Sequence, residues 1–438
     1  MLEYLRLKNV GPAPEMEMEL APRLNLITGD NGLGKSFLLD VAWWALTRSW
    51  ARQLVVPRPA RVKPTIEYRY TKKTRGPYSY VSTFDRRRET WSIQHGRPAI
   101  PGLVLYAQVD GGFSVWDPAR NYWRKDAPDR PASFLFAPTE VWEGNALCEG
   151  LVRDWASWQR EGGIAFEELQ RVLARLAPGP DEPLQPGALV KLSIDDPKRY
   201  PTLAMPYGQD VAVVHASAGM RRIIALAYLL VWAWQEHLAA AALLGNPPAK
   251  EVIFLIDETE AHLHPKWQLH IVPALLEVMD ALTEGHGSRA QLITTTHSPL
   301  VLTSAEPGFD TDRDAWFDMD LETTAKGTRV VLQKRPFARL GTAGRWLTSN
   351  AFDLPSEGRA PRAAELLEEA GIALSDESFD RKKAAQLDER LRGILGDTDP
   401  FWIRWRFVGE QRGWLPEPPQ SSDRSLAHPR AKKPRTKR

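Results

Sequence analysis

Residues 29–36 read Gly-Asp-Asn-Gly-Leu-Gly-Lys-Ser, and this stretch decides the fold of the chain. The preceding residues Leu24–Thr28 form an apolar run of strand length, and Phe37–Leu46 behind it has the length and periodicity of a helix. A strand, a glycine-rich loop and a helix in that order aim backbone N–H groups and a helix N-terminus at a polyphosphate. The stretch therefore predicts a nucleotide-binding P-loop, and an accidental glycine turn is the alternative.

Each residue of the loop has an expected role. Lys35 is predicted to lie against the β- and γ-phosphates of ATP, and the Ser36 hydroxyl to ligate Mg²⁺. The other residues expected to line the bound nucleotide are Gly29, Asn31, Gly32, Gly34 and Phe37.

Composition and charge are those of an ordinary globular protein. Of 438 residues 43% are hydrophobic and 26% charged, and the net charge of +2 creates no global cationic field that would announce nucleic acid. Cys148 is the single cysteine, which excludes an intrachain disulfide. The longest apolar stretch, Ile223–Trp234, is shorter than the roughly 18–20 residues that span a bilayer, so we expect a buried helix. With no signal-peptide pattern at Met1–Leu7, the sequence predicts a cytoplasmic protein without membrane contact.

A second group of motifs completes the expected ATP site. Val252–Ile256 is continuously apolar, as in a parallel strand buried on both faces, and it ends in Asp257-Glu258. Asp257 is the predicted Mg²⁺ ligand, and Glu258 is placed to polarise the attacking water as a general base. A solvated acidic turn is the alternative. His297 follows the strand Gln291–Thr296 and is expected to contact the γ-phosphate or orient the water, since ligands gather at that edge of a sheet.

A second helix start has the features of an anion site. Ser217-Ala-Gly219-Met-Arg221 opens the long apolar helix. By default Ser217 is an N-cap, but its hydroxyl and the adjacent N–H groups can equally face an anion. Together with the P-loop, this predicts two half-sites.

In this order, the motifs resemble those of the ABC-type ATPase superfamily, and most closely its non-transporter branch with the RecF/SMC-like and OLD-family ATPases. The resemblance covers about residues 1–335, and its specific motifs lie at 29–36, 217–221, 252–264 and 294–299. It implies an α/β fold, an ABC-ATPase head in which a P-loop sheet adjoins an antiparallel β subdomain.

The resemblance also implies a homodimer that closes around ATP. Ser217 and Gly219 of one subunit would cover the γ-phosphate held by the P-loop of the other. Residues 260–264 would form the D-loop that reaches across the interface, and His297 would be the switch histidine. Gln108 is the best candidate for the Q-loop glutamine, with Gln94 as an alternative, and Ala218 departs from the usual signature.

Composition and motif positions suggest five regions. They are an N-terminal ATPase lobe with the P-loop and an antiparallel β-meander near 65–115 (1–145), a helical insertion (146–200), a C-terminal ATPase lobe (201–335), a helical region (336–418) and a basic tail (419–438).

The resemblance points to a sensor or motor ATPase of a prokaryotic anti-phage defence or DNA-metabolism complex, which gates a separate effector, possibly a nuclease. A RecF-like repair ATPase acting directly on DNA and a hydrolysis-poor, ATP-dependent scaffold are the alternatives. Possible nucleic-acid contacts are three basic clusters: Arg69 with Lys72, Lys73 and Arg75; Arg86–Arg88; and Arg430–Arg438. Asp318-Met-Asp320 could belong to a nuclease centre, but its alternation with Phe317 and Met319 favours an ordinary strand.

Overall fold

The computed structural model describes residues 1–57, 62–70, 78–92, 101–121, 132–325, 327–354 and 358–414. It divides into two compact units, Met1–Leu354 and Pro355–Arg438. Lys72, Lys73, Arg75, Gln94 and the basic tail, which the sequence analysis singled out, lie outside the described residues.

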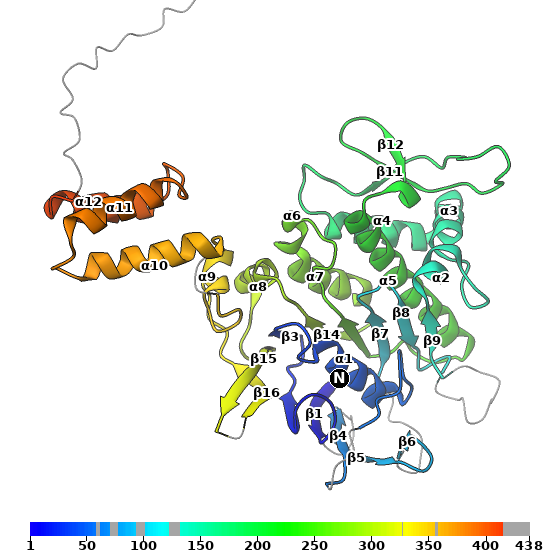
Figure 1. The fold of residues 1–438 in the computed structure, drawn as a ribbon. Coiled ribbons are helices and arrows are strands. Elements are labelled where there is room, and N and C mark those ends of the chain that lie inside the picture. Colours follow the sequence, from blue (N-terminus) through cyan, green and yellow to red (C-terminus); the bar gives the residue numbers. More distant parts are fainter. Residues whose placement is uncertain are drawn as a thin grey trace, which may run out of the picture. The chain divides into compact units, whose positions relative to one another are not determined.

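An eight-stranded mixed sheet forms the centre of the first unit (Figure 1). Five strands run parallel in its middle: β15 (Asp314–Thr324), β3 (Leu24–Gly29), β14 (Arg289–Thr295), β13 (Glu251–Ile256) and β7 (Leu103–Ala107). The antiparallel strands at its edges are β16 (Gly327–Arg335), β8 (Phe113–Trp116) and β9 (Phe134–Phe136). Because β3, β13 and β14 are adjacent and parallel, their carboxyl ends meet at one edge, where the P-loop begins.

The prediction for β7 was wrong. Residues near 65–115 were expected to form one antiparallel meander, but β7 pairs in parallel with β13 in the main sheet. All five of its residues are buried, and such a continuous apolar run is typical of a strand covered on both faces. The meander is thereby limited to a smaller sheet.

That smaller antiparallel sheet has the order β2-β1-β4-β5-β6. Its strands are β1 (Leu2–Lys8), β2 (Glu15–Glu19), β4 (Thr65–Tyr70), β5 (Tyr78–Asp85) and β6 (Thr90–Trp91). With the main sheet it confirms the predicted α/β fold, a P-loop sheet beside an antiparallel β subdomain.

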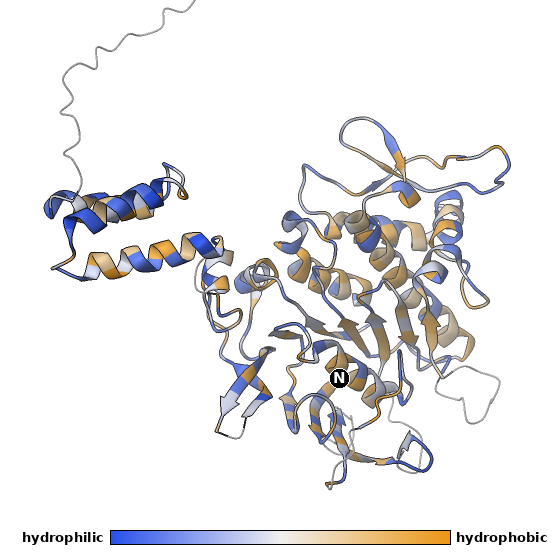
Figure 2. Cartoon of the chain, viewed as in Figure 1, coloured by the Kyte–Doolittle hydropathy of each residue, from blue (hydrophilic) through white to orange (hydrophobic). Residues whose placement is uncertain are grey.

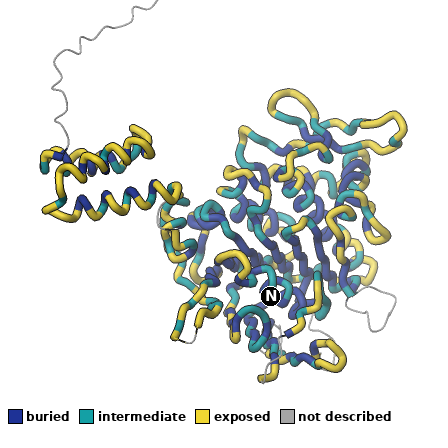
Figure 3. Tube along the Cα trace, viewed as in Figure 1, coloured by how far each residue is buried: buried dark blue, intermediate teal, exposed yellow. Residues whose placement is uncertain are grey.

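The core of the first unit has two layers, one on each face of the main sheet. Successive strand residues point to opposite faces, so Leu105 and Phe254 join one apolar cluster while Val104 and Ile253 join the other. Helix α1 (Lys35–Thr47) packs in the second layer together with the antiparallel sheet. Figure 3 shows the central strands buried and the outer loops exposed.

The opposite layer is helical. It contains α2 (Pro138–Glu143), α3 (Leu151–Glu161), α4 (Ile164–Leu176), α5 (Ala218–Leu243), α6 (Pro265–Gln268), α7 (Ile271–Thr283) and α8 (Pro299–Ala305). Between α4 and α5 lie a small sheet of β10 (Gln185–Pro186), β11 (Thr202–Ala204) and β12 (Asp210–Ala212), and the 3-10 turn η1 (Val213–His215). A second 3-10 turn, η2 (Glu306–Gly308), follows α8, and the short helix α9 (Ala343–Leu347) follows β16.

Helix α5 is apolar and long enough to cross a membrane by length and composition alone, but 72% of its most apolar stretch is buried in the core, as expected for a core helix. The helical segment after β13 is interrupted, because α6 and α7 separate at His270. Pro273 explains the break, because it has no N–H and its ring excludes a continuous helix four residues back.

The second unit, described over residues 358–414, is a small helical bundle of α10 (Pro361–Ser375), α11 (Arg381–Arg392) and α12 (Phe401–Gln411). Apolar and polar residues alternate along α10 (Figure 2), and the apolar face packs into a core of its own around Leu387 and Trp405.

Candidate functional site

The P-loop has a backbone that only glycine can adopt at two positions. Gly29 has φ +134°, and a Cβ there would lie 2.2 Å from the Met319 carbonyl oxygen on β15. Gly34 has φ +106°, and a Cβ would lie 2.7 Å from Pro12. Because β15 and Pro12 approach the loop so closely, both positions require glycine.

Helix α1 begins without a side-chain cap. Its N-cap is Gly34, and no side chain accepts a hydrogen bond from the first-turn amides. These orphan N–H groups and the positive end of the helix dipole face the loop, an arrangement that suits a phosphate. The Lys35 ammonium folds back over the loop and donates to the carbonyl oxygens of Gly29 (2.7 Å) and Asp30 (2.8 Å). Burial lowers the pKa of Lys35, and the nearby carboxylate of Glu258 offsets part of that effect.

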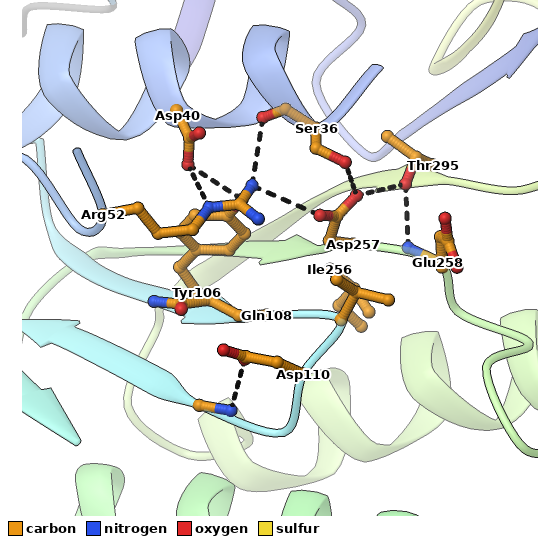
Figure 4. A network of polar contacts seen from close by, with 12 residues as sticks. Ser36, Asp40, Arg52, Tyr106, Gln108, Asp110, Ile256, Asp257, Glu258 and Thr295 are labelled. Atoms are coloured by element: carbon orange, nitrogen blue, oxygen red, sulfur yellow. Dashed lines mark hydrogen bonds and ion pairs between the residues drawn. The ribbon is translucent and has the colours of Figure 1, made fainter. Parts of the chain in front are cut away.

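Asp257 lies fully buried at the carboxyl end of β13, where three side chains hold it (Figure 4). Its Oδ1 accepts hydrogen bonds from Ser36 Oγ and Thr295 Oγ1, both at 2.9 Å. Its Oδ2 lies 3.3 Å from the Arg52 guanidinium. The structure thus brings together Ser36 and Asp257, the two residues predicted to ligate Mg²⁺. Hydroxyl and carboxylate oxygens are donors that Mg²⁺ prefers, so the residues present fit this ion.

Arg52 connects Asp257 to a partly buried network of polar side chains. Its Nε donates to Asp40 (2.9 Å), and its terminal nitrogen donates to the Tyr106 hydroxyl (2.7 Å). The Tyr106 hydroxyl in turn donates to Asp40 (3.1 Å). Burial opposes the charge on Arg52, but Tyr106, Asp40 and Asp257 raise its pKa, so Arg52 stays cationic. Sequence reasoning missed Arg52 and Tyr106, because no motif surrounds either residue.

Glu258 adopts an unusual backbone conformation. Its φ of +48° lies in the left-handed region, which is uncommon for a residue other than glycine. Its N–H donates to Thr295 Oγ1 (2.8 Å), and the same hydroxyl donates to Asp257. Thr295 therefore holds both consecutive carboxylate residues, and the strained turn presents Glu258 at the site.

His297 lies beside Glu258 after β14. Its Nε2 is 3.7 Å from Glu258 Oε1, which is within ion-pair range but longer than a hydrogen bond. Burial and the charge of Lys35 lower the pKa of His297 below its ordinary value, so the imidazole is neutral at pH 7. The two residues predicted to be catalytic therefore lie near the P-loop lysine, at the same sheet edge as Asp257.

Gln108 directly follows β7, and its side-chain amide is hydrogen-bonded to β8. The side chain is buried, and its Nε2 donates to Ser114 Oγ (2.9 Å) on β8. The backbone carbonyl oxygen of Gln108 accepts from Arg222 (2.6 Å), a residue of α5 that also donates to the backbone carbonyl oxygens of Val109 and Asp257, both at 3.2 Å. Arg222 thus links the start of α5 to the ends of β7 and β13. The Q-loop role of Gln108 stays a prediction.

The Ser217 start of α5 differs from the P-loop. The Ser217 side chain is exposed and accepts a long hydrogen bond (3.4 Å) from the N–H of Met220, as an N-cap does. Gly219 is buried, and a Cβ there would lie 2.6 Å from the His262 carbonyl oxygen. Among the described residues, no hydrogen bond joins Ser217 to the P-loop of its own chain.

A cavity of about 690 Å³ opens beside the P-loop. The loop and the first turn of α1 form one wall, with Gly32, Gly34 and Ser36, and residues 52–56 form another. Leu54 and Val56 are exposed there, which leaves apolar surface next to the phosphate-binding amides. This space is suited to the nucleoside part of a nucleotide.

A P-loop between β3 and α1, with Asp257 at the end of β13, a parallel strand of the same sheet, defines the P-loop ATPase class of proteins. A family model described as "AAA domain, putative AbiEii toxin, Type IV TA system" matches residues 24–303, and the chain belongs to this family.

Two curated relatives match shorter stretches. The Retron Ec83 probable ATPase of Escherichia coli is 26% identical over 169 residues, 39% of this chain and 27% of that protein. The Retron Vc95 probable ATPase of Vibrio cholerae serotype O1 biovar El Tor is 36% identical over 97 residues, 22% of this chain and 17% of that protein. The chain therefore matches less than a third of the length of either relative.

Solved structures resemble the chain only distantly. An SMC head domain from Thermotoga maritima is 15% identical, with a TM-score of 0.40, over 76% of this chain and 99% of that one. The recombination mediator protein RecF is 12% identical, with a TM-score of 0.38, over 77% of this chain and 98% of that one. At such low scores the likeness carries no functional argument.

Proposed function

We propose that the protein binds and hydrolyses ATP with Mg²⁺ at the P-loop site. The observation that carries the proposal is the meeting of Ser36 with Asp257 (2.9 Å) and of Glu258 with His297 (3.7 Å) at one sheet edge, beside uncapped amides of α1. This arrangement supports a phosphate-binding loop, a cation site and a candidate base within one chain.

Each of these residues has a step to perform. The P-loop amides and Lys35 hold the β- and γ-phosphates, which requires the Lys35 ammonium to exchange the carbonyl oxygens of Gly29 and Asp30 for phosphate oxygens. Ser36 and Asp257 would hold Mg²⁺, which supplies charge neutralisation on the phosphates when bound. Glu258 accepts the proton of the attacking water, and the neutral imidazole of His297 orients that water or contacts the γ-phosphate.

We further propose that two subunits form a homodimer around ATP. Support comes from the Ser217 start of α5, which is exposed and has no hydrogen bond to the P-loop of its own chain among the described residues. In the dimer, Ser217 and Gly219 of one subunit would face the γ-phosphate held by the other. The five-region division of the chain and the Q-loop role of Gln108 belong to this same proposal.

The family and the names of the relatives suggest a setting. The two relatives named above are described as retron probable ATPases, and the family description mentions a toxin–antitoxin system. We infer that this ATPase acts in a prokaryotic defence complex in the cytoplasm and gates a separate effector. Turnover with the product of a neighbouring gene, compared with turnover with DNA alone, separates this proposal from a repair ATPase that acts directly on DNA.

The test of the ATP site is Lys35→Ala. The substitution removes the charge that faces the phosphates, so we expect loss of binding in an equilibrium titration with a fluorescent ATP analogue, and loss of hydrolysis. The conservative control is Lys35→Arg, which keeps the charge but not the compact ammonium. Unchanged affinity of Lys35→Ala would refute the assignment of the P-loop.

A further inference from the structure

Glu260 has a place in the structure that its expected role in a D-loop does not explain. A residue of a loop that reaches across an interface should point outward, but the carboxylate of Glu260 points into its own chain. Its Oε2 accepts from the Thr296 hydroxyl (2.7 Å), and its Oε1 accepts from the backbone N–H of His297. Two hydrogen bonds thereby join the loop after β13 to the loop after β14, at and next to His297, the residue proposed to contact the γ-phosphate.

A second side chain strengthens the same connection. Gln268, in α6, donates to the Leu263 carbonyl oxygen (2.8 Å) and accepts from the Ser298 hydroxyl (2.6 Å). Glu260 therefore holds Thr296 and His297, and Gln268 holds Ser298. The Thr296 hydroxyl also accepts from the N–H of Ser298 (3.0 Å), so the turn that carries His297 is a closed hydrogen-bonded unit.

The Glu260 carboxyl group is partly buried, and both of its oxygens accept hydrogen bonds from the segment after β14, a pair of bonds that forms a clamp. Burial raises the pKa of Glu260, and the hydrogen bonds from His297 and Thr296 offset part of that effect. Breaking these bonds would leave buried polar groups without partners, which is costly. Because Glu260 lies in the same short loop as His262 and Leu263, a shift of that loop would move the His297 backbone with it.

We propose that Glu260 is a positioning residue that couples the 260–264 loop to His297. The inference rests on the proposed ATPase function, because it assigns Glu260 a part in aligning His297 for hydrolysis. Contact of a second subunit with the exposed residue His262 would displace the 260–264 loop, and the hydrogen bond from His297 to Glu260 would transmit that displacement to His297. Closure of the dimer would thereby be linked to hydrolysis.

Kinetics of Glu260→Ala give the first test. Loss of the clamp misplaces His297 without touching the P-loop, and a misplacement of about 1 Å can cost roughly 10²-fold in rate. We expect kcat to fall at least about 10-fold while KM changes little. Glu260→Gln should recover most of the rate, because its amide oxygen can accept from His297 and its NH₂ can donate to Thr296. The control is Glu277→Ala on α7, an exposed glutamate outside the site, which should behave as wild type.

Hydrogen–deuterium exchange of the nucleotide-free protein tests the clamp independently of catalysis. A peptide spanning residues 294–299 should exchange faster in Glu260→Ala than in wild type, and Glu260→Gln should retain most of the protection. If the wild type shows no hydrolysis, the proposed function fails, but the exchange data still decide whether Glu260 holds His297.

Unchanged exchange, or an unchanged kcat in an active protein, would overturn the proposal. If Glu260→Ala does not fold, Thr296→Val removes one arm of the clamp with little change of shape. Faster exchange in that variant would support the clamp, and wild-type exchange would refute it.

Discussion

The two helix starts proposed to face phosphate, at α1 and at α5, differ in how far their own chain completes them. At α1 the N-cap is Gly34 and no side chain caps the helix, while Ser36 and Lys35 are bonded to Asp257 and to the loop carbonyls. At α5 the exposed Ser217 caps its own helix through a long bond, and Gly219 packs against the His262 carbonyl oxygen. The first start is a nearly finished half-site. At the second, the exposed Ser217 hydroxyl donates no hydrogen bond among the residues that the structure describes, as expected of a half-site completed by another subunit.

The largest effect expected at the α1 half-site is that of Glu258→Gln. Loss of the base should slow hydrolysis by at least about 10²-fold, because a positioned general base contributes that much or more. ATP binding should persist, since Lys35 and Ser36 are unchanged. Steady-state turnover and titration with a fluorescent analogue measure the two effects. Hydrolysis at the wild-type rate in this variant would show that Glu258 is not the general base.

Ser217→Arg tests whether the α5 half-site acts between subunits. A bulky cation at the helix start should block closure and hydrolysis while leaving affinity at the P-loop little changed. Mixing Ser217→Arg with Lys35→Ala subunits should then restore partial hydrolysis, because one of the two sites would pair an intact P-loop with an intact Ser217.

The measurement is the ATPase rate across a mixing series, with mixed dimers confirmed by mass. If confirmed mixed dimers recover no ATPase activity, Ser217 is an ordinary helix cap, and the start of α5 is not a half-site for ATP.

Arg52→Gln should lower the free energy of unfolding of the nucleotide-free protein, because Arg52 supports Asp257 at the α1 half-site. The substitution leaves the buried carboxylate of Asp257 and the partly buried one of Asp40 without their cation, at a cost of about 3 kcal/mol or less because Arg52 is partly exposed. Chemical denaturation without nucleotide measures the loss. The matched control is Arg153→Gln, whose exposed pair with Glu149 should contribute less than about 1 kcal/mol. Equal stabilities of the two variants would contradict the network drawn around Asp257.

The smallest expected effect is that of pH near neutrality. The lowered pKa of His297 keeps the imidazole neutral at pH 7, so protonation occurs only as pH falls through a value below 6.5. If hydrolysis needs the neutral ring, kcat should be flat above pH 6.5 and should decline below it. A decline that begins above pH 7 in wild type, and that is absent from His297→Gln, would show that the pKa of His297 is raised instead.

The motifs that could be found in the sequence are those whose residues are contiguous. Leu24–Ser36 and Val252–Glu258 each combine a strand with its functional residues in one short stretch, so order and residue type were enough to identify them. The same reasoning failed for β7, where a continuous apolar run was assigned to the antiparallel meander although it fits a doubly covered strand better.

By itself the sequence determined the P-loop, the apolar strand that ends in Asp257-Glu258, and the α/β class. These are local patterns, set by strand and helix periodicity and by the need for glycine where the backbone takes positive φ.

Only the tertiary structure decided which distant side chains meet at the site. Arg52 reaches Asp257 across 205 positions, and Thr295 reaches it across 38. Glu260 likewise turns toward His297 because β13 and β14 lie side by side. Burial of Asp257 requires such partners, since an unpaired charge in the core is costly, but any of several cationic or hydroxyl residues could have provided them. The fold selected among them when it closed β3, β13 and β14 into one parallel sheet edge.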